Sequence, residues 1–502
     1  MKPVLTGSQI RRLERGAVAN GVSIPTLMEN AGSALAERAL HFASPEGRFA
    51  ILCGRGNNGG DGLVAARKLA EAGRRFQLEV IGGKEKLAAE AVRLYESLAR
   101  ASSDFSPGPG DVVVDALLGT GVNRNPEGDY AQAIGRIDAW RRAGAWVLSA
   151  DLPSGLDTDS GRPYEPCVWA DATLAFGHLK LAHVLEPGAS RCRVVQCADI
   201  GLPASSSPFG EDSPTFLLEL SDVLEWFPKR QADSHKGTYG HALIVAGSPG
   251  RTGAAALCGM GALRAGAGLA SIACRPEAIN SVLAHAPELM GLPLPGRGGL
   301  AVSDLGALCS AAEGKQAVVI GPGIDRGEET AELLRLFLAQ LSVPCLLDAD
   351  GLNAVARHLD VLSSAKGPLI LTPHPGEMAR LIGSTSTQVQ RERLAVARSL
   401  ATSRKLVVVL KGARTLVALP DGTVFVNPTG NAGMATAGTG DVLAGICGGL
   451  LAQKLAPARS AAVAVYAHGR AGDIAAQRVG QAGLVASDLL TALGEQWRRL
   501  ER

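Results

Sequence analysis

Short apolar runs that each end in a polar or glycine-rich loop restrict how this chain can fold more than any other feature. In the first half the runs cover residues 49–53, 76–81, 112–117, 146–150 and 172–176. Several are apolar throughout, which is typical of strands buried on both faces of a parallel sheet. Helix-like segments separate them, and one of these begins with Pro25 in its first turn. The first half is therefore predicted to be a parallel, helix-covered α/β sheet.

Length and charge limit the classes of protein that need to be considered. The chain has 502 residues, enough for two domains, and its 50 Lys and Arg against 48 Asp and Glu leave a net charge of +2. This balance does not indicate nucleic acid or a membrane as a partner. No stretch approaches the ~18 apolar residues of a membrane span. The nine cysteines lie mostly in apolar surroundings, which favours a reduced, cytoplasmic protein.

The segment GRGNNGGDG, residues 54–62, follows the first apolar run and precedes a helix-like segment. Glycine allows a ligand to approach the backbone closely, while Asn57, Asn58 and Asp61 supply hydrogen-bond donors and acceptors. The segment matches neither the dinucleotide fingerprint nor the phosphate loop. We interpret it as a loop that holds a polar ligand; the alternative is a glycine- and asparagine-rich surface turn.

Two further polar loops, residues 115–125 and 151–161, also follow predicted strands. Ligands bind beyond the carboxyl ends of the strands in such sheets, so the three loops are expected to form one site. They contain no His, Cys or Lys, which argues against nucleophilic catalysis. Asp151 is the best-placed acid or base, because it directly follows a buried strand. The structural alternative for Asp151 is a turn or a helix cap.

Three oxygen-bearing residues of these loops could hold a cation. Asn58, Asp115 and Ser154 together carry one charge, which fits a weakly held monovalent cation better than zinc. The alternative is that these side chains hydrogen-bond to one another between loops.

The motifs MENAG (28–32), GRGNNGGDG, VDALLGTG (114–121) and DLPSGLDTDSG (151–161) resemble, in this order, the NAD(P)H-hydrate epimerase domain over residues 1–215. The resemblance implies a Rossmann-like α/β/α sandwich that interconverts the R and S epimers of NADHX and NADPHX. It makes Asp151 the catalytic acid or base and assigns potassium to Asn58, Asp115 and Ser154. The residues it places against the hydrated cofactor are Asn57, Asn58, Gly59, Gly60, Asp61, Gly119, Thr120, Gly121, Val122, Asn123, Arg124, Asn125 and Asp151.

One loop departs from the family pattern. The family has an Arg-Pro pair after GTG and its following residue, whereas here Asn125 separates Arg124 from Pro126. Which of residues 123–125 contact the substrate therefore stays open.

A segment rich in Pro, Ser and Gly, residues 203–222, predicts a linker, and a second α/β unit is expected over residues 225–502. Its predicted strands are residues 242–246, 317–320, 345–347, 369–371 and 406–410. Its clearest predicted helices are residues 328–341 and 389–402.

The sharpest feature of the second half is AGTGDVLAG, residues 437–445, where a glycine turn opens an apolar helix. Free N–H groups at a helix start can stabilise a transferring phosphoryl group, and Asp441 could take a proton from an attacking hydroxyl. The alternative for Asp441 is a first-turn acid favoured by the helix dipole. Lys411 could meet nucleotide phosphates or be solvated, and His374 could bind a ligand or be structural.

The motifs HKGTYGHALIVAGS (235–248), GPGID (321–325), DADGLN (348–353), LTPHPGEMARL (371–381) and NAGMATAGTGDVLAG (431–445) resemble the ADP/ATP-dependent NAD(P)H-hydrate dehydratase. This family has a ribokinase-like α/β domain, and the resemblance covers residues 225–500. It implies phosphoryl transfer from ADP to the hydroxyl of the S hydrate and then elimination, which yields NAD(P)H, AMP and phosphate. Magnesium is expected to accompany the nucleotide.

The same resemblance assigns roles to individual residues of the second domain, with Asp441 as its catalytic residue. The residues it places against the S hydrate are Ala254, Gly323, His374 and Asp441. Those it places against the adenine nucleotide are Lys411, Gly412, Ala413, Arg414, Thr415 and Gly440.

Another reading of the chain joins a small-molecule kinase to a binding module without catalytic activity. The residues do not decide between ADP and ATP as the donor, or between NADHX and NADPHX as the preferred substrate. Resemblance to bacterial two-domain members leans towards ADP and towards a homo-oligomer.

Overall fold

The computed structural model describes residues 1–502 except 88, 203–207, 325–328 and 501–502. It contains two compact units, one of residues Lys2–Asp212 and one of Met1 with Ser213–Arg502. The predicted linker includes residues 203–207, which lie outside the described part, and the domain limits at residues 215 and 225 stay predictions. Among the described helices, none has the length and hydrophobicity that a membrane span requires.

The first unit contains a six-stranded sheet in the order β3-β2-β4-β5-β6-β8, and every neighbouring pair is parallel. Its strands are β2 (Phe49–Cys53), β3 (Phe76–Val80), β4 (Val112–Ala116), β5 (Trp146–Ala150), β6 (Ala172–Phe176) and β8 (Val194–Ala198). The five predicted strands are confirmed. The prediction missed the edge strand β8, because its side chains are largely exposed and form no continuous apolar run. Two short strands, β1 (Lys2–Leu5) and β7 (Leu179–Lys180), pair in parallel.

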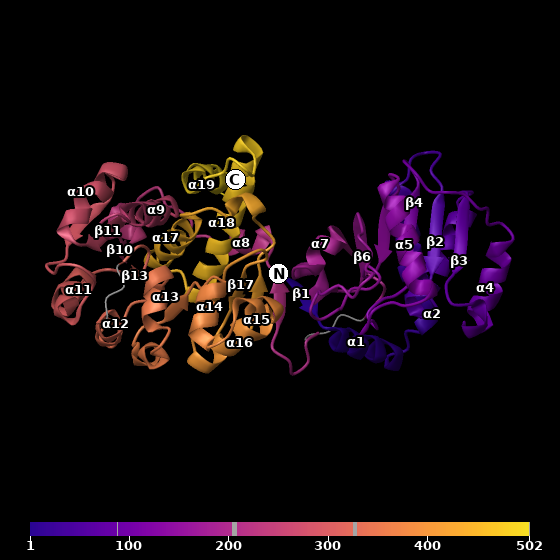
Figure 1. The fold of residues 1–502 in the computed structure, drawn as a ribbon, viewed down its shortest axis with the longest axis horizontal. Helices are drawn as coiled ribbons and strands as arrows, with labels where there is room; N and C mark the ends of the chain where they lie inside the picture. The colour runs from indigo at the N-terminus through magenta and orange to yellow at the C-terminus, as the bar shows by residue number, and fades with distance from the viewer. Residues whose placement is uncertain (88, 203–207, 325–328, 501–502) are drawn as a thin grey trace. The chain divides into compact units, whose positions relative to one another are not determined.

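Helices cover both faces of this sheet, as predicted (Figure 1). Phe49 and Ile51 pack in one apolar cluster with α2 (Ile24–Phe42) and α3 (Asn57–Glu71). Ala50 and Leu52, which alternate with them along β2, pack in another cluster with α5 (Asp129–Arg142). The remaining helices of the unit are α1 (Gly7–Ala19), α4 (Ala89–Ala99), α6 (Leu181–Val184) and α7 (Gly188–Cys192).

The glycine-rich segment differs from the prediction, because α3 begins at Asn57 and most of the expected loop is helix. A β-carbon added at Gly59 would lie 1.8 Å from the carbonyl oxygen of Gly54, and one at Gly62 would lie 2.7 Å from Sγ of Cys53. Glycine at both positions therefore lets the start of α3 pack directly against β2 and the backbone that follows it.

The second unit contains a larger sheet in the order β12-β11-β10-β13-β14-β15-β16-β17-β18-β9. Neighbours are parallel except for β17, which is antiparallel to β16 and β18. The strands are β9 (Thr215–Leu217), β10 (His241–Val245), β11 (Leu269–Cys274), β12 (Met290–Pro293), β13 (Ala317–Ile320), β14 (Cys345–Leu347), β15 (Leu369–Leu371), β16 (Val407–Leu410), β17 (Leu416–Ala418) and β18 (Val424–Val426). The five predicted strands form within a residue of their expected bounds. The strands that were not predicted are β9, β11, β12, β17 and β18. All but β11 are only three or four residues long, which is too short for a clear hydrophobic period.

Two layers of helices flank this sheet, with α9 (Thr252–Arg264) and α19 (Ala486–Leu500) on the opposite side of the strands from α12 (Thr330–Leu338), α14 (Pro375–Ile382) and α16 (Arg393–Arg404) (Figure 1). The helices are α8 (Leu220–Trp226), α9 (Thr252–Arg264), α10 (Pro276–His285), α11 (Leu305–Ala312), α12 (Thr330–Leu338), α13 (Ala349–Val355), α14 (Pro375–Ile382), α15 (Ser386–Arg391), α16 (Arg393–Arg404), α17 (Thr439–Ala452), α18 (Pro457–Val479) and α19 (Ala486–Leu500). The helix predicted over residues 389–402 is wrong as one element, because Glu392 leaves the helical conformation and separates α15 from α16. Glu328 of the helix predicted over residues 328–341 lies outside the described residues.

The strand order reverses once in the parallel part of each sheet, between β2 and β4 in the first unit and between β10 and β13 in the second. Loops that leave adjacent strands at such a reversal separate and open a crevice beyond the strand ends. The loops that begin at Gly54 and Asp115 follow or end β2 and β4, and Gly323 follows β13, whereas Asp151, His374 and Lys411 follow other strands of the same sheets, β5, β15 and β16.

Close packing of α17 on α9 gives a prediction for the second unit. A β-carbon added at Gly445 would lie 2.0 Å from the carbonyl oxygen of Cys258, so Gly445→Ala should destabilise this unit by about 1–3 kcal/mol. Gly306→Ala in α11 is the matched control, because a β-carbon there meets nothing within 4 Å. Chemical denaturation would measure both variants, and equal free energies of unfolding would contradict the packing.

Candidate active sites

A cavity of about 920 Å³ lies at the reversal point of the first unit. Of the residues predicted to bind the hydrated cofactor, those that line it are Asn57, Asn58, Asp61, Asp151 and residues 119–125. Gly59 and Gly60 are buried. A β-carbon at Gly60 would lie 2.5 Å from the methionine side chain of Met28, so the two glycines serve the packing of α3. The structure thus brings the three predicted loops to one cavity.

Asp151 sits in a constrained position at the end of β5. Its φ of 60° lies in the left-handed region, which a non-glycine residue seldom adopts. Its Oδ1 accepts a hydrogen bond from the backbone N–H of Phe176 at 2.9 Å and pairs with the Lys180 ammonium. The Nε2 atom of His183 lies 2.7 Å from the Asp151 carbonyl oxygen. Burial lowers the pKa of His183 to about 4, so the ring is neutral and donates this bond.

Lys180, the charged partner of Asp151, was not among the residues predicted from the sequence. Its side chain is only 1% exposed, and its Nζ also donates to the carbonyl oxygen of Phe176 at 2.8 Å. The prediction considered only residues in the three loops, whereas Lys180 lies in the short strand β7. A signal was present, because Lys180 follows the buried strand β6 by four residues and is a lysine in an otherwise apolar stretch.

Two other carboxyl groups line the cavity near this pair. Burial raises the pKa of Asp61 well above its usual range, and the nearby charges of Asp151 and Glu14 raise it further. Burial also raises the pKa of Glu14, against the opposing effect of Lys180. The sequence analysis named Asp61 as a binding residue and did not single out Glu14 of α1.

The three residues predicted to bind potassium lie together, but two of them are already hydrogen-bonded. The Asp115 carboxylate accepts bonds from Ser154 Oγ at 2.5 Å, Ser154 N at 2.8 Å and Ser149 Oγ at 2.9 Å. The amide nitrogen of Asn58 is buried and has no hydrogen-bond partner among the described residues. Because a half-turn of an amide exchanges its oxygen and nitrogen, Asn58 can offer an oxygen at the same place. The amide, carboxylate and hydroxyl oxygens of these three residues, with one negative charge among them, suit a monovalent cation.

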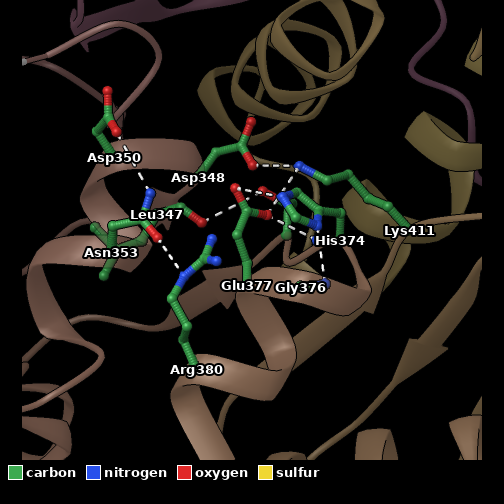
Figure 2. A network of polar contacts seen from close by, with 10 residues as sticks. Leu347, Asp348, Asp350, Asn353, His374, Gly376, Glu377, Arg380 and Lys411 are labelled. Carbon is green, nitrogen blue, oxygen red and sulfur yellow. Dashed lines mark hydrogen bonds and ion pairs between the residues drawn. The ribbon is translucent and has the colours of Figure 1, made fainter. Parts of the chain in front are cut away.

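A chain of charged side chains forms the second site, at the ends of β14, β15 and β16 (Figure 2). Nζ of Lys411 lies 2.6 Å from Oδ1 of Asp348 and 3.6 Å from Oε2 of Glu377. Oε2 of Glu377 accepts the backbone N–H of His374 at 2.7 Å, and Nδ1 of His374 accepts that of Gly376 at 3.0 Å. Burial lowers the pKa of His374, so its neutral form is favoured. The sequence analysis missed Asp348 and Glu377 as site residues, although both lie in the strand-end motifs it quoted.

Asp441 lies in the first turn of α17, close to this chain of charges. Burial raises the pKa of Asp441 to about 7, and the Asp348 carboxylate raises it while the Lys411 ammonium lowers it. A β-carbon at Gly440 would lie 3.6 Å from Nζ of Lys411, so the lysine faces the N-terminal turn of the helix. The structure therefore brings Asp441, Gly440 and Lys411 together, as predicted.

Two more residues that were predicted to bind the S hydrate, Ala254 and Gly323, lie next to each other. A β-carbon at Gly323 would lie 3.1 Å from the β-carbon of Ala254, so these two positions are adjacent. The predicted nucleotide loop, residues 411–415, joins β16 to β17. Arg393 of α16 donates to the carbonyl oxygens of Leu410 at 3.1 Å and Lys411 at 3.3 Å, which fixes the start of this loop. The quoted motif GPGID ends at Asp325, outside the described residues.

Both units of the chain are similar to known protein families. Residues 242–494 match the family described as NAD(P)H-hydrate dehydratase, and residues 25–182 match the family described as YjeF-related protein N-terminus. A bifunctional NAD(P)H-hydrate repair enzyme of Moorella thermoacetica is 40% identical over 99% of this chain and 97% of its own length. The chain belongs to the family of bifunctional NAD(P)H-hydrate repair enzymes. The member from Escherichia coli K12 is 36% identical over 96% of this chain and 92% of its own.

Solved structures match the second unit of this NAD(P)H-hydrate repair family member. A ribokinase-like superfamily protein of Enterococcus faecalis V583 is 26% identical with a TM-score of 0.50, covering 57% of this chain and 97% of that one. It confirms the predicted ribokinase-like fold. An ADP/ATP-dependent NAD(P)H-hydrate dehydratase of Bacillus subtilis, co-crystallised with ATP and Mg²⁺, is 32% identical with a TM-score of 0.49 and covers 57% of this chain and 99% of that one.

The charges around Asp441 give a prediction for a titration. Lys411→Met removes a cation that favours the Asp441 carboxylate, so the pKa of Asp441 should rise above its value of about 7. Carbon-detected NMR titration of the carboxyl groups would measure this change. Lys366→Met, which removes a lysine outside this charged cluster, should leave the titration unchanged. A pKa that stays at about 7 in the Lys411 variant would show that this ammonium does not act on Asp441.

Proposed function

We propose that the first unit of this chain interconverts the R and S epimers of NADHX and NADPHX. We further propose that the second unit dehydrates the S epimer with ADP, releasing AMP and phosphate. The observation that carries the proposal is that each unit has its own lysine, paired with carboxylates, at the carboxyl ends of its parallel strands. Asp151 pairs with Lys180 in one unit, and Asp441 lies beside Lys411 in the other. Two separate acid–base sites suit two reactions on one substrate.

In the first unit, Asp151 acts as the acid or base at the hydrated ring carbon. Its left-handed backbone, its bond from Phe176 and its contact with Lys180 hold the carboxylate at the cavity wall. Asn57, Asn58 and the loop of residues 119–125 bind the hydrated cofactor from the other walls. The cavity of about 920 Å³ is within the usual size for a small-molecule site.

Potassium is proposed at Asn58, Asp115 and Ser154. The support is the buried, unpartnered amide of Asn58 and the single charge of the donor set. A cation there would connect the start of α3 with the loops after β4 and β5, and all three segments line the cavity. Bound potassium would supply positive charge and so fix the loops that contact the substrate.

In the second unit, the free N–H groups at the start of α17 hold the transferring phosphoryl group, and Gly440 lets it approach the backbone. Asp441 takes the proton from the hydroxyl of the S hydrate as that hydroxyl attacks phosphorus. Ala254, Gly323 and His374 bind the hydrate, and residues 411–415 bind the adenine nucleotide. Lys411 reaches from its carboxylate partners towards Gly440 and meets the phosphates.

Magnesium is proposed to accompany the nucleotide. Within the described residues, no group of three or more His, Cys, Asp or Glu side chains is placed to hold a metal alone. Mg²⁺ usually takes one or two carboxylates together with phosphate oxygens, and Asp348 and Glu377 supply such carboxylates beside Lys411. When bound, the ion would neutralise phosphate charge.

The cellular setting is proposed from the cysteines. All nine are free, and seven of them are fully or almost fully buried, which suits a reducing cytoplasm. Homo-oligomerisation and the absence of nucleic-acid and membrane partners remain predictions.

Single variants should separate the two activities. Asp441→Asn should abolish ADP-dependent repair and leave epimerisation unchanged, while Asp151→Ala should do the reverse. Each variant is the control for the other, and chromatography of the two epimers with the absorbance of NADH measures both rates. Because the base must be ionised, the wild-type dehydration rate should rise as the pH increases through about 7.

Loss of both activities in a folded single variant would contradict the separation. Phosphate that stays attached to the product would instead favour a small-molecule kinase.

A further inference from the structure

Asp61 is a carboxyl residue of the first cavity whose position suits more than binding. It lies in the second turn of α3, is only 8% exposed, and lines the cavity together with Asp151 and Lys180. Among the described residues, no hydrogen bond or ion pair holds its carboxyl group, whereas Asp151 has both. The two carboxyl groups thus share one cavity but have different environments.

The elements around Asp61 place acidic and apolar side chains near its carboxyl group, together with one lysine. Glu14 of α1 and Asp151 after β5 face it, and Lys180 of β7 is the nearby cation, already paired with Asp151. Cys53 of β2 lies beneath it. A carboxyl group placed in this way keeps its proton more readily than a solvated one, whereas Asp151 has the Lys180 ammonium and the backbone N–H of Phe176 beside its carboxyl group.

We propose that Asp61 is the general acid of epimerisation and works with Asp151 as the general base. The inference rests on the proposed epimerase function and adds a second proton-transferring residue to it. The buried carboxyl of Asp61 and the ion-paired carboxylate of Asp151 supply the two protonation states that such a reaction needs. The raised pKa of Asp61, caused first by burial and then by the neighbouring carboxylates, supports this division.

The chemistry follows from the hydrate itself, in which the hydroxyl-bearing ring carbon is bonded to the ring nitrogen. Asp61 gives its proton to the hydroxyl oxygen, the C–O bond breaks with its electron pair on oxygen, and water leaves. The nitrogen lone pair forms the C=N bond of an iminium ion. Water then attacks the opposite face, a new C–O bond forms, the C=N pair returns to nitrogen, and Asp151 takes the proton. Proton exchange through cavity water restores both groups.

Kinetics of the whole chain test the proposal. Asp61→Asn should lower kcat of epimerisation by about 10²–10⁴-fold with KM little changed, and Asp61→Glu should recover part of the loss. The matched control is Asp138→Asn in α5, a carboxyl whose pKa is also raised by burial but which lies outside the cavity. It should epimerise at the wild-type rate.

Two further measurements are made on the wild type, and the first is then compared with the variant. Wild-type kcat should fall at alkaline pH as Asp61 loses its proton, and residual activity of Asp61→Asn should lack this fall. In water labelled with ¹⁸O, each epimerisation should place one solvent oxygen in the product.

Several results would overturn the role of Asp61. They are a rise in KM with unchanged kcat in Asp61→Asn, a flat alkaline profile in the wild type, or retention of the original oxygen. In each case wild-type epimerisation would persist and the proposed function would stand. Absence of epimerisation in the wild type would instead remove the proposed function itself.

Discussion

Direct packing of helix backbone against neighbouring backbone is the constraint on which both sites depend. Gly59 and Gly62 let the start of α3 approach β2, and Gly445 lets α17 lie against α9. A β-carbon at any of these positions would overlap atoms of the neighbouring segment. The close approach places the N-terminal parts of both helices at the strand ends, with Asp61 in the second turn of α3 and Asp441 in the first turn of α17. The glycines thus determine where the acids lie, although they carry no chemistry themselves.

A lysine paired with carboxylates then contributes the positive charge of each site. Lys180 is paired with Asp151, so this carboxylate is held in place and compensated in a region shielded from water. Lys411 is shared between Asp348 and Glu377, and its charge also lowers the pKa of Asp441 against the effect of burial. In both units one carboxyl group is paired and another is left with a raised pKa. This arrangement suits proton transfer at neutral pH better than two equivalent carboxylates would.

The apolar runs and the order of the loops were enough to predict the α/β class and the central strands that carry the sites, five of the six described strands of the first sheet and five of the ten of the second, because continuous burial on two faces leaves a clear pattern. They also predicted Asp151, Asp441 and the loops that line the first cavity. Lys180 could not be found in the same way, because its contact with Asp151 depends on a chain reversal after β6 and not on local sequence. Nor could the sequence show that Asn57 begins a helix, since five glycines in nine residues indicate a loop until the packing of α3 on β2 is known. Most of the missed strands are edge strands or have only three residues and bury too little to show a period, but β11 was missed although it has six residues and is buried.

The central claim is that one chain repairs both epimers because it carries two independent acid–base sites. The most direct measurement supplies purified protein with a mixture of R and S NADHX, ADP and Mg²⁺, and follows the recovery of NADH after correction for spontaneous epimerisation. The account predicts complete conversion by the wild type. Asp151→Ala should stop when the S epimer is exhausted. Conversion by the wild type that also stops at the S fraction would contradict the account.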